Sequence, residues 1–358
     1  MIKLFDPHIT EDEVKAATST IKSKFWASGN GVKHVDKFEK EFKKYTHSKS
    51  CIAVNNGTSA LHLAFSLFDI KKREVLVPSL TFVSTISTII QNGGKPVFVD
   101  IDPITFCLDP NDAEKKITKN TAAIVPVHFA GYAADLSHFQ KIIKNHEIKI
   151  IEDAAHATGT KHNGKMIGSI SDATCFSFHP VKNLAMPTGG AICLNTKNYT
   201  KYENSLKSLR WCGITNRHGT SYDVEQIGWN FYMNEISASI GLVQLKKLDR
   251  LNNKRKSVAK RYNSELNISL KMPYSEECSY HFYWICVKDR SKFIKKMKQL
   301  GIETGIHYKP VHQMSFSKSK TKLPITEKAG NEIVSLPTHP NLTEKHVDKI
   351  ISCINNHV

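Results

Sequence analysis

The 358-residue sequence lacks the patterns that mark several common classes of protein. Its eight cysteines are scattered, with no C-x-x-C pair and no H-E-x-x-H, which argues against a disulfide framework and a metal centre. No apolar run approaches the roughly 18 residues that a membrane span needs. The stretch MIKLFDPHITEDEV (1–14) also lacks the order of a signal peptide. We therefore expect a cytoplasmic protein with no metal site and no membrane association.

Acidic residues are scarce compared with basic ones: 33 Asp and Glu stand against 50 Lys and Arg, a net charge of +17. Such an excess suits a nucleic acid, a membrane surface or an anionic small substrate. The densest basic run is KKLDRLNNKRKSVAKRYNSEL (246–266), whose apolar residues recur near helical spacing. This spacing predicts a helix with a solvated basic face, although composition alone does not exclude a binding surface.

The first two-thirds of the chain alternates strand-like and helix-like segments. Short β-branched runs occupy 51–56, 74–79, 95–101, 122–129 and 148–154. Strands separated by helical stretches predict an α/β fold with a mostly parallel central sheet flanked by helices. After about residue 240 a long charged helix (235–266), a strand-like stretch and two further helical segments predict a smaller α+β domain. We expect domains at 1–250 and 251–358, with a helix after the Thr10–Glu13 capping box packing on either one.

Two motifs follow predicted strands and therefore belong to the edge of the sheet where ligands bind. In NNGTSAL (55–61), Gly57 turns the chain and Thr58 and Ser59 open a helix, either as an anion site or as an ordinary N-cap. In IIEDAAHATG (150–159), Asp153 ends a strand, either as a site carboxylate or as a helix cap, and His156 follows it. No P-loop and no G-x-G-x-x-G occurs.

Lys182 lies in CFSFHPVKNLAMPTGG (175–190), on an irregular connection between two strand-like runs. A buried lysine loses its charge readily, which suits it to form a Schiff base with an aldehyde. A phosphate cradle, a carboxylate for a pyridine nitrogen and a lysine for an aldehyde are together what pyridoxal phosphate (PLP) requires. The three signals therefore indicate PLP as the cofactor.

The sequence resembles the DegT/DnrJ/EryC1/StrS sugar aminotransferases, a fold-type I PLP-dependent family, almost from end to end. The matching segments in the first half are SGNGVKHVDKFEKEF (28–42), NNGTSALHLA (55–64), VPSLTFVST (77–85), KPVFVDID (95–102), VHFAGYAADL (127–136) and IIEDAAHATG (150–159). Those in the second half are SFHPVKN (177–183), IGWNFYMNEISASIGLVQLKKLD (227–249) and GIHYKPVHQ (305–313). Their order along the chain makes the resemblance specific.

The resemblance implies a role for each matching residue. Lys182 would carry PLP covalently and move the substrate proton, with pyridoxamine phosphate as the intermediate, and Asp153 would pair with the pyridine nitrogen. Phe82 would stack on the cofactor ring, or else be an ordinary core aromatic, and His156 would lie by its phenolic oxygen. The phosphate would be held by Gly57, Thr58, Ser59 and Ser177, joined by Asn230 of the neighbouring subunit, so that a homodimer is the minimal active unit.

The sequence departs from the family pattern at two places. Family members usually carry an acidic residue before the Gly-Gly that follows the lysine, where this chain has Pro187 and Thr188. Many also have a basic residue where this chain has Tyr232. Both departures touch the expected substrate region, which His307, Tyr308 and His312 of GIHYKPVH would border unless they pack one domain against the other.

The reaction that the resemblance implies is transfer of an amino group from an amino acid, L-glutamate foremost, to a keto sugar. The expected acceptor is a nucleotide-linked 4- or 3-keto-deoxyhexose used for surface polysaccharide or glycoconjugate. Alternatives are an aminotransferase acting on a free keto sugar or keto-deoxy sugar acid, and a PLP-dependent sugar dehydratase, which is expected to have His where this chain has Lys182. A non-catalytic nucleic-acid-binding protein is the alternative from a different class, against which the Lys182–Asp153 pairing speaks.

Overall fold

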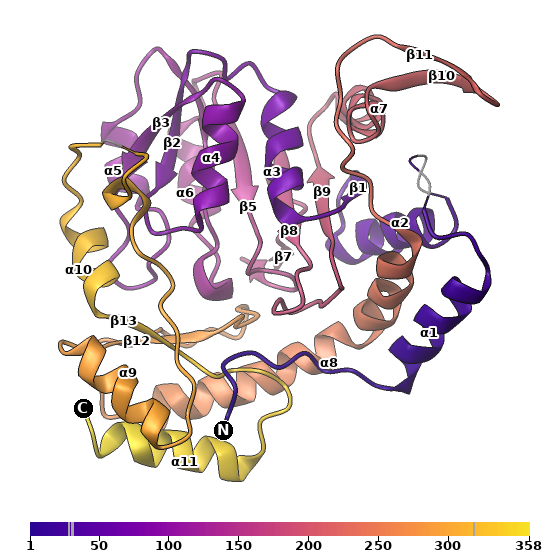
Figure 1. The fold of residues 1–358 in the computed structure, drawn as a ribbon. Coiled ribbons are helices and arrows are strands. Elements are labelled where there is room, and N and C mark those ends of the chain that lie inside the picture. The colour runs from indigo at the N-terminus through magenta and orange to yellow at the C-terminus, as the bar shows by residue number, and fades with distance from the viewer. Residues whose placement is uncertain (28, 30–31, 318) are drawn as a thin grey trace.

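The computed structural model describes residues 1–27, 29, 32–317 and 319–358, which form an α/β fold around a central sheet (Figure 1). Among these residues the sheet has seven strands in the order β1-β9-β8-β5-β4-β2-β3. Strand β9 runs antiparallel to its neighbours β1 and β8, and the other pairs in the sheet are parallel. The predicted mostly parallel sheet is therefore confirmed.

The elements of the first half of the chain are α1 (Glu11–Lys22), α2 (His34–Thr46), β1 (Ser50–Val54), α3 (Gly57–Ser66), β2 (Glu74–Pro78), α4 (Val83–Gln91), β3 (Lys95–Val99), α5 (Pro110–Lys115), β4 (Thr121–Ile124), the 3-10 helix η1 (Phe129–Gly131), α6 (Leu136–Ile142), β5 (Lys149–Asp153), β6 (Lys161–His162), β7 (Lys165–Met166) and β8 (Ala173–Ser177). Those of the second half are β9 (Gly190–Leu194), α7 (Tyr199–Leu209), β10 (Ile214–His218), β11 (Ser221–Val224), α8 (Glu235–Glu265), β12 (Tyr283–Cys286), α9 (Arg290–Gln299), the 3-10 helix η2 (Val311–Gln313), α10 (Pro324–Glu332), β13 (Ile333–Leu336) and α11 (Glu344–Asn355).

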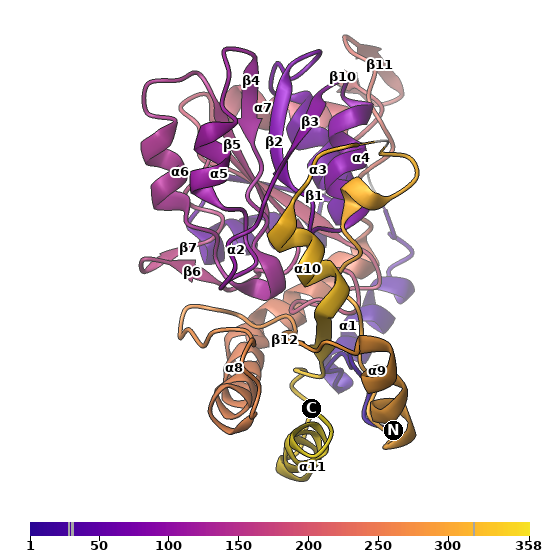
Figure 2. The same ribbon diagram turned by 90° about the vertical axis from the view of Figure 1, so that its left-hand side faces the viewer.

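Helices cover both faces of the sheet, as Figure 2 shows with α5 and α6 on one side and α3 and α4 on the other. The apolar side chains form one cluster on each face. The cluster beside α3, α4 and α7 includes Leu61, Ile86 and Leu206. The other cluster includes Phe42 of α2 and Phe139 of α6, and it continues into the C-terminal elements through Trp284. The strands are thus buried on both faces, which explains their continuous β-branched runs.

Most predicted elements are present within a few residues of their expected bounds. The Thr10–Glu13 capping box opens α1, and the long charged helix is α8, with Leu248, Leu251, Val258 and Tyr262 buried as its spacing predicted. The strand expected over 122–129 is shorter, because β4 ends at Ile124 and Pro126 has no N–H to continue the ladder. Of the motif at 28–42, Ser28, Asn30 and Gly31 lie outside the described residues.

Helix α8 contacts both the N-terminal and the C-terminal elements of the chain. The predicted domain boundary near residue 250 lies inside this helix. Its first half contacts the N-terminal region, where Lys247 pairs with Glu13. Its second half contacts α11, where Arg261 forms ion pairs with Glu344 and Asp348 at 2.9 and 2.8 Å. The N-terminal segment also reaches the C-terminal elements, since Ile2 forms a parallel bridge with Ile302.

The eight cysteines, all within the described ranges, are free, and five of them are buried. In the part of the chain that the structure describes, no group of three or more His, Cys, Asp or Glu side chains is placed to bind a metal ion. No helix in these ranges is long and apolar enough to cross a membrane.

Candidate active site

Three strands of the sheet end around one cavity of about 330 Å³. Strand β1 leads into the Asn56–Gly57 turn, β5 ends at Asp153, and β8 ends at Ser177. Because parallel strands place their carboxyl ends at the same edge of a sheet, residues far apart in sequence meet here. The cavity is lined by Asn56, Gly57, Thr58, Leu61, Thr81, Phe82, Ser84, Val127, Asp153, Ala155, His156, Cys175, Ser177, His179, Val181, Lys182, His281, His307 and Tyr308.

Asp153 is the buried carboxylate of this cavity, with 5% of its surface exposed. The Thr85 hydroxyl donates to its Oδ2 at 2.7 Å, and the backbone N–H of Ala155 donates to its Oδ1 at 3.1 Å. Thr85 is in turn in contact with the Thr81 hydroxyl at 2.9 Å. These contacts fix the carboxylate against the cavity wall, where it can face a cationic partner.

The first turn of α3 forms another wall of the cavity. Asn56 caps the helix by accepting from the N–H of Ser59 at 2.8 Å, which leaves the first-turn amides of Gly57 and Thr58 without partners in their own helix. A side chain at position 57 would lie 2.7 Å from Cβ of Ser177, so only glycine fits there without displacing β8. The helix start therefore presents N–H groups and the Thr58 and Ser177 hydroxyls as an anion site.

Lys182 extends into the cavity from the irregular connection between β8 and β9. Burial lowers the pKa of its amine from 10.5 to about 8, against the opposing effect of the Asp153 carboxylate. The amine is thus partly neutral near neutral pH, as nucleophilic attack on an aldehyde requires.

Several aromatic side chains surround Lys182. His156 contacts the Tyr308 hydroxyl through Nε2 at 3.1 Å, whereas its Nδ1 is buried without a hydrogen-bond partner. Burial, and next the nearby Lys182 cation, hold the pKa of His156 well below its usual value. The same two causes lower the pKa of His307 to about 4, so both rings are neutral. Phe82 is 54% exposed for an apolar side chain, with Tyr308 5.9 Å away between ring centroids.

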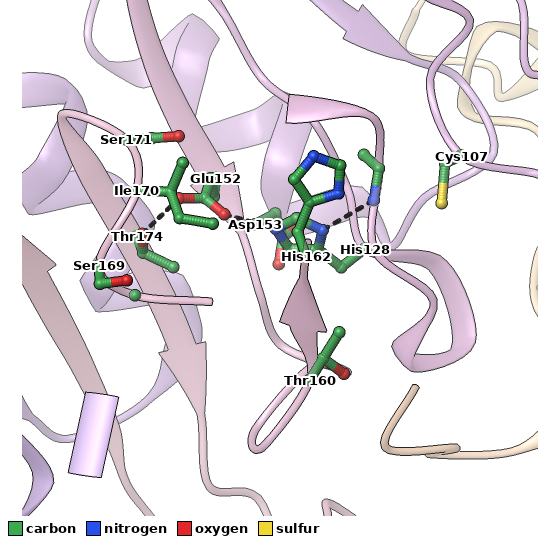
Figure 3. A network of polar contacts seen from close by, with 12 residues as sticks. Cys107, His128, Glu152, Asp153, Thr160, His162, Ser169, Ile170, Ser171 and Thr174 are labelled. Carbon is green, nitrogen blue, oxygen red and sulfur yellow. Dashed lines mark hydrogen bonds and ion pairs between the residues drawn. The ribbon is translucent and has the colours of Figure 1, made fainter. Parts of the chain in front are cut away.

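A second polar cluster lies behind Asp153, on the other face of β5 (Figure 3). Glu152 accepts from the Thr174 hydroxyl at 2.7 Å and contacts Nε2 of His128 at 2.7 Å. Nδ1 of His128 accepts the N–H of Ala134 at 3.1 Å, so Nε2 carries the proton and donates to Glu152. The backbone N–H of His128 also donates to the carbonyl of Asp153 at 3.1 Å. This cluster ties the segment after β4 to β5 and β8.

Nine of the predicted site residues line the cavity together: Gly57, Thr58, Phe82, Asp153, His156, Ser177, Lys182, His307 and Tyr308. Ser59, Asn230 and His312 do not line it. Ser59 is buried in the first turn of α3, and Asn230 is exposed on the segment after β11. His312 is buried elsewhere, with Nδ1 2.6 Å from the Ser79 hydroxyl and Nε2 3.4 Å from Glu327. His312 therefore packs between Ser79 and Glu327 and does not border the cavity.

Two residues of the site escaped the sequence reasoning. Thr85 belongs to a quoted motif, but helical spacing alone does not show that it faces Asp153. His281 precedes β12 in a stretch identified only as strand-like, and the fold brings its Nε2 to 3.5 Å from Nζ of Lys182. The structure also gives Thr188 a contact, since its hydroxyl donates to the carbonyl of Asn55 beside the α3 turn. Tyr232 forms a bridge with Val54 at the end of β1.

A model of the DegT/DnrJ/EryC1/StrS aminotransferase family matches residues 7–355. The chain belongs to this family. The spore coat polysaccharide biosynthesis protein SpsC of Bacillus subtilis (strain 168) is 34% identical to it over 376 residues, covering 98% of this chain and 95% of that protein. GDP-perosamine synthase of Escherichia coli O157:H7 is 32% identical over 362 residues, covering 99% and 98%.

Solved structures agree with this assignment. The PLP form of the sugar aminotransferase Spr1654 from Streptococcus pneumoniae superposes with a TM-score of 0.92 at 29% identity, covering 99% of this chain and 98% of that chain. The fold is thus that of the fold-type I enzymes, as the resemblance implied. The family, the named relatives and the shared fold together make the chain a PLP-dependent sugar aminotransferase.

The residues of the cavity fit PLP. The open first turn of α3 with Gly57 against Ser177 suits a phosphate, and the buried Asp153 carboxylate suits a protonated pyridine nitrogen. The exposed Phe82 ring and the unpaired Nδ1 of His156 are groups that a bound aromatic, polar ligand would cover. We find no residue of the cavity that opposes this cofactor.

Proposed function

We propose that this sugar aminotransferase moves an amino group from L-glutamate to a nucleotide-linked 4- or 3-keto-deoxyhexose, with PLP held covalently by Lys182. The observation that carries the proposal is the joint placement of Lys182 and Asp153 in one cavity beside the open start of α3. When bound, PLP supplies an electron sink that stabilises the carbanion left when the substrate carbon loses its proton. Gly57, Thr58 and Ser177 would hold its phosphate, and Asp153 its pyridine nitrogen.

Lys182, Asp153 and the side chains around them would each have a different role in the reaction. Nζ of Lys182 would accept the proton from the substrate carbon that bears the amino group and return it to the cofactor carbon on the other side of that nitrogen, because its lowered pKa leaves a neutral amine available. Asp153, fixed by Thr85 and Ala155, keeps its charge directed at one position of the cavity. Phe82 and His156 enclose the reacting atoms, and His307 and Tyr308 border the space left for the substrate.

The nucleotide-linked acceptor is supported by charge and by relatives. The chain carries a net charge of +17, which attracts a sugar attached to a diphosphate. One relative is a GDP-perosamine synthase and another is a spore coat polysaccharide biosynthesis protein. We therefore place the product in surface polysaccharide or glycoconjugate synthesis, in a cytoplasmic enzyme.

We also propose that the active unit is a homodimer. Asn230, which the family resemblance assigns to the neighbouring subunit's phosphate site, is exposed and does not line the cavity of its own chain. The β10–β11 hairpin beside it projects from the body of the molecule (Figure 1). Tyr222, Val224 and Ile227 are 57%, 45% and 88% exposed there, as expected of side chains that a partner covers. The division into domains at 1–250 and 251–358 remains part of this proposal.

The first test is the absorbance spectrum of the purified protein with PLP, before and after addition of L-glutamate. We expect a visible band from the covalent adduct, which Lys182→Ala lacks, and loss of that band when glutamate donates its nitrogen. Borohydride reduction and peptide mapping would place the adduct on residue 182.

A panel of nucleotide-linked keto sugars, free keto sugars and keto-deoxy sugar acids then identifies the acceptor by mass. Gain of nitrogen on a nucleotide-linked 4- or 3-keto-deoxyhexose supports the proposal. A deoxy sugar formed without gain of nitrogen would show a dehydratase instead, and a band that ignores glutamate would show another donor.

A further inference from the structure

His281 is a polar side chain that contacts the amine of Lys182 and that none of the proposed roles uses. Its Nε2 lies 3.5 Å from Nζ of Lys182, slightly longer than the roughly 2.7–3.2 Å of an ordinary N–H hydrogen bond. Catalytic hydrogen bonds are often this long before a ligand binds. His281 comes from the segment before β12, 99 positions from Lys182 in the chain, and is 1% exposed.

The protonation state of His281 follows from its surroundings. Burial first, and then the cations and rings around it, beginning with Lys182, hold its pKa well below the usual value, so the ring is neutral. A neutral imidazole has one N–H and one lone pair. Nδ1 is buried with no hydrogen-bond partner, so Lys182 is the polar partner that the ring has among the described residues.

The ring of His281 is held rigidly. Phe5 of the N-terminal segment stacks on it with centroids 5.1 Å apart and an interplanar angle of 16°. The ring of His156 lies 4.5 Å away. The backbone N–H of His281 donates to the carbonyl of Ala130 at 2.9 Å, which fixes the main chain as well. A fixed ring can direct the flexible end of a lysine, whereas a mobile one cannot.

The ring is also costly to keep. A buried nitrogen without a partner has lost its hydrogen bonds to water and gained none in the protein, which destabilises the folded state. An apolar ring of similar shape, stacked on Phe5 in the same way, would avoid this cost. The arrangement is therefore poorly explained by stability, and the contact with Lys182 is what the histidine gains over an apolar residue.

We infer that His281 is a positioning residue for Lys182: its Nε2 accepts one N–H of the amine, so that the lone pair of Nζ is directed into the cavity. This inference rests on the proposed function, in which that lone pair attacks the aldehyde of PLP and later accepts the substrate proton. No proton leaves Lys182 for His281 in this role, and the imidazole stays neutral throughout.

The test is the rate at which PLP attaches covalently to Lys182, followed by stopped-flow absorbance near pH 8. This rate involves neither the amino donor nor the sugar. We expect His281→Phe, which keeps an aromatic ring against Phe5, to slow attachment by about 10²-fold, as for other small misplacements of a reacting group. His281→Gln, whose amide can occupy the place of Nε2, should recover the rate to within about tenfold of the original protein.

His339→Phe is the matched control. His339 is also buried, also has an unpaired Nδ1 and also contacts the N-terminal segment, through the carbonyl of Lys3 at 3.1 Å, but it does not line the cavity. We expect this variant to attach PLP at the original rate. Its thermal denaturation midpoint should be no higher than that of His281→Phe.

Each outcome decides the inference. Attachment at the original rate in His281→Phe, or attachment as slow in His281→Gln as in His281→Phe, overturns the positioning role while leaving the proposed function intact. The same holds if His339→Phe slows attachment as much as His281→Phe. Absence of any adduct on Lys182 in the unaltered protein overturns the proposed function and this role together.

Discussion

Strand β5 carries two buried polar clusters, one on each face, which differ in how completely their hydrogen bonds are satisfied. On one face, both oxygens of Glu152 and both ring nitrogens of His128 have partners (Figure 3). On the other face, around Asp153 and Lys182, Nδ1 of His156 and Nδ1 of His281 are buried without partners. Successive residues of a strand point to opposite faces, so Glu152 and Asp153 belong to different environments although they are neighbours in sequence.

The difference indicates that the Glu152 cluster stabilises the fold and that the Asp153 cluster binds a ligand. A fully satisfied buried network stabilises one conformation, whereas an incompletely satisfied one raises the energy of the empty protein until a ligand supplies the missing partners. Each cluster contains one carboxylate and at least one histidine. The residue types therefore do not distinguish the two clusters. The buried nitrogens without hydrogen-bond partners do distinguish them.

The largest effect is expected from Lys182→Arg in the unsatisfied cluster. Arginine keeps the positive charge but cannot form the covalent bond to PLP, and a positioned general base typically contributes a factor of about 10²–10⁴. Transamination should fall at least that far, measured by the loss of glutamate nitrogen, while circular dichroism stays unchanged. Turnover within tenfold of the original would contradict the assignment of Lys182 as the base.

The satisfied cluster is disrupted by His128→Leu, which leaves Oε2 of Glu152 and the N–H of Ala134 buried without a partner. A buried donor or acceptor left without a partner costs about 1–3 kcal/mol. We expect a clear drop in the thermal denaturation midpoint, with covalent attachment of PLP still detectable at low temperature. An unchanged midpoint together with lost attachment would instead place this cluster in the chemistry.

A smaller effect on attachment, but a clear one on turnover, is expected from Asp153→Asn. The amide can keep the contact with the Thr85 hydroxyl but loses the charge, so turnover should fall by about 10²-fold or more. The Asp153 carboxylate raises the pKa of Lys182. Without that carboxylate, the pH at which covalent attachment of PLP reaches half its maximal rate should fall below the original value of about 8. A midpoint that moved upward would contradict the direct electrostatic contact.

The smallest effect concerns stability below neutral pH. The pKa of His307 is about 4 in the folded protein and 6.5 in an exposed chain, so the unfolded state binds more protons between these values. Stability of the cofactor-free protein should therefore fall as the pH falls from about 6.5 to about 4. His307→Asn, which keeps a polar group for Ser335, should reduce that slope by at most about 1.4 kcal/mol per pH unit, measured by denaturation across this range. An unchanged slope would mean that His307 is already protonated in the folded state.

The sequence could predict the parallel sheet and much of the site because both follow from local patterns. Gly57 and Asp153 each follow a strand-like run, and the ends of such strands must meet, whereas Ser177 was expected only from the family resemblance. His281 could not be found in this way, since it reaches Lys182 only when the C-terminal elements pack on the sheet. For the same reason the spacing that predicted the buried face of α8 did not show that Arg255, in its basic run, is buried and donates to the carbonyl of Thr338 at 3.0 Å.

The N-terminal segment has a consequence for how the protein is made. Leu4 donates its N–H to Glu303, 299 positions further along the chain, and Phe5 stacks on His281. At a synthesis rate of about 5–20 residues per second, residues 2–5 wait roughly 15–60 s on the ribosome before these partners exist. The helices and strands of the sheet can fold during that time. The stacking of Phe5 on His281, beside Lys182, cannot form until His281 has been made. The enzyme therefore becomes competent only after residue 303 has been synthesised.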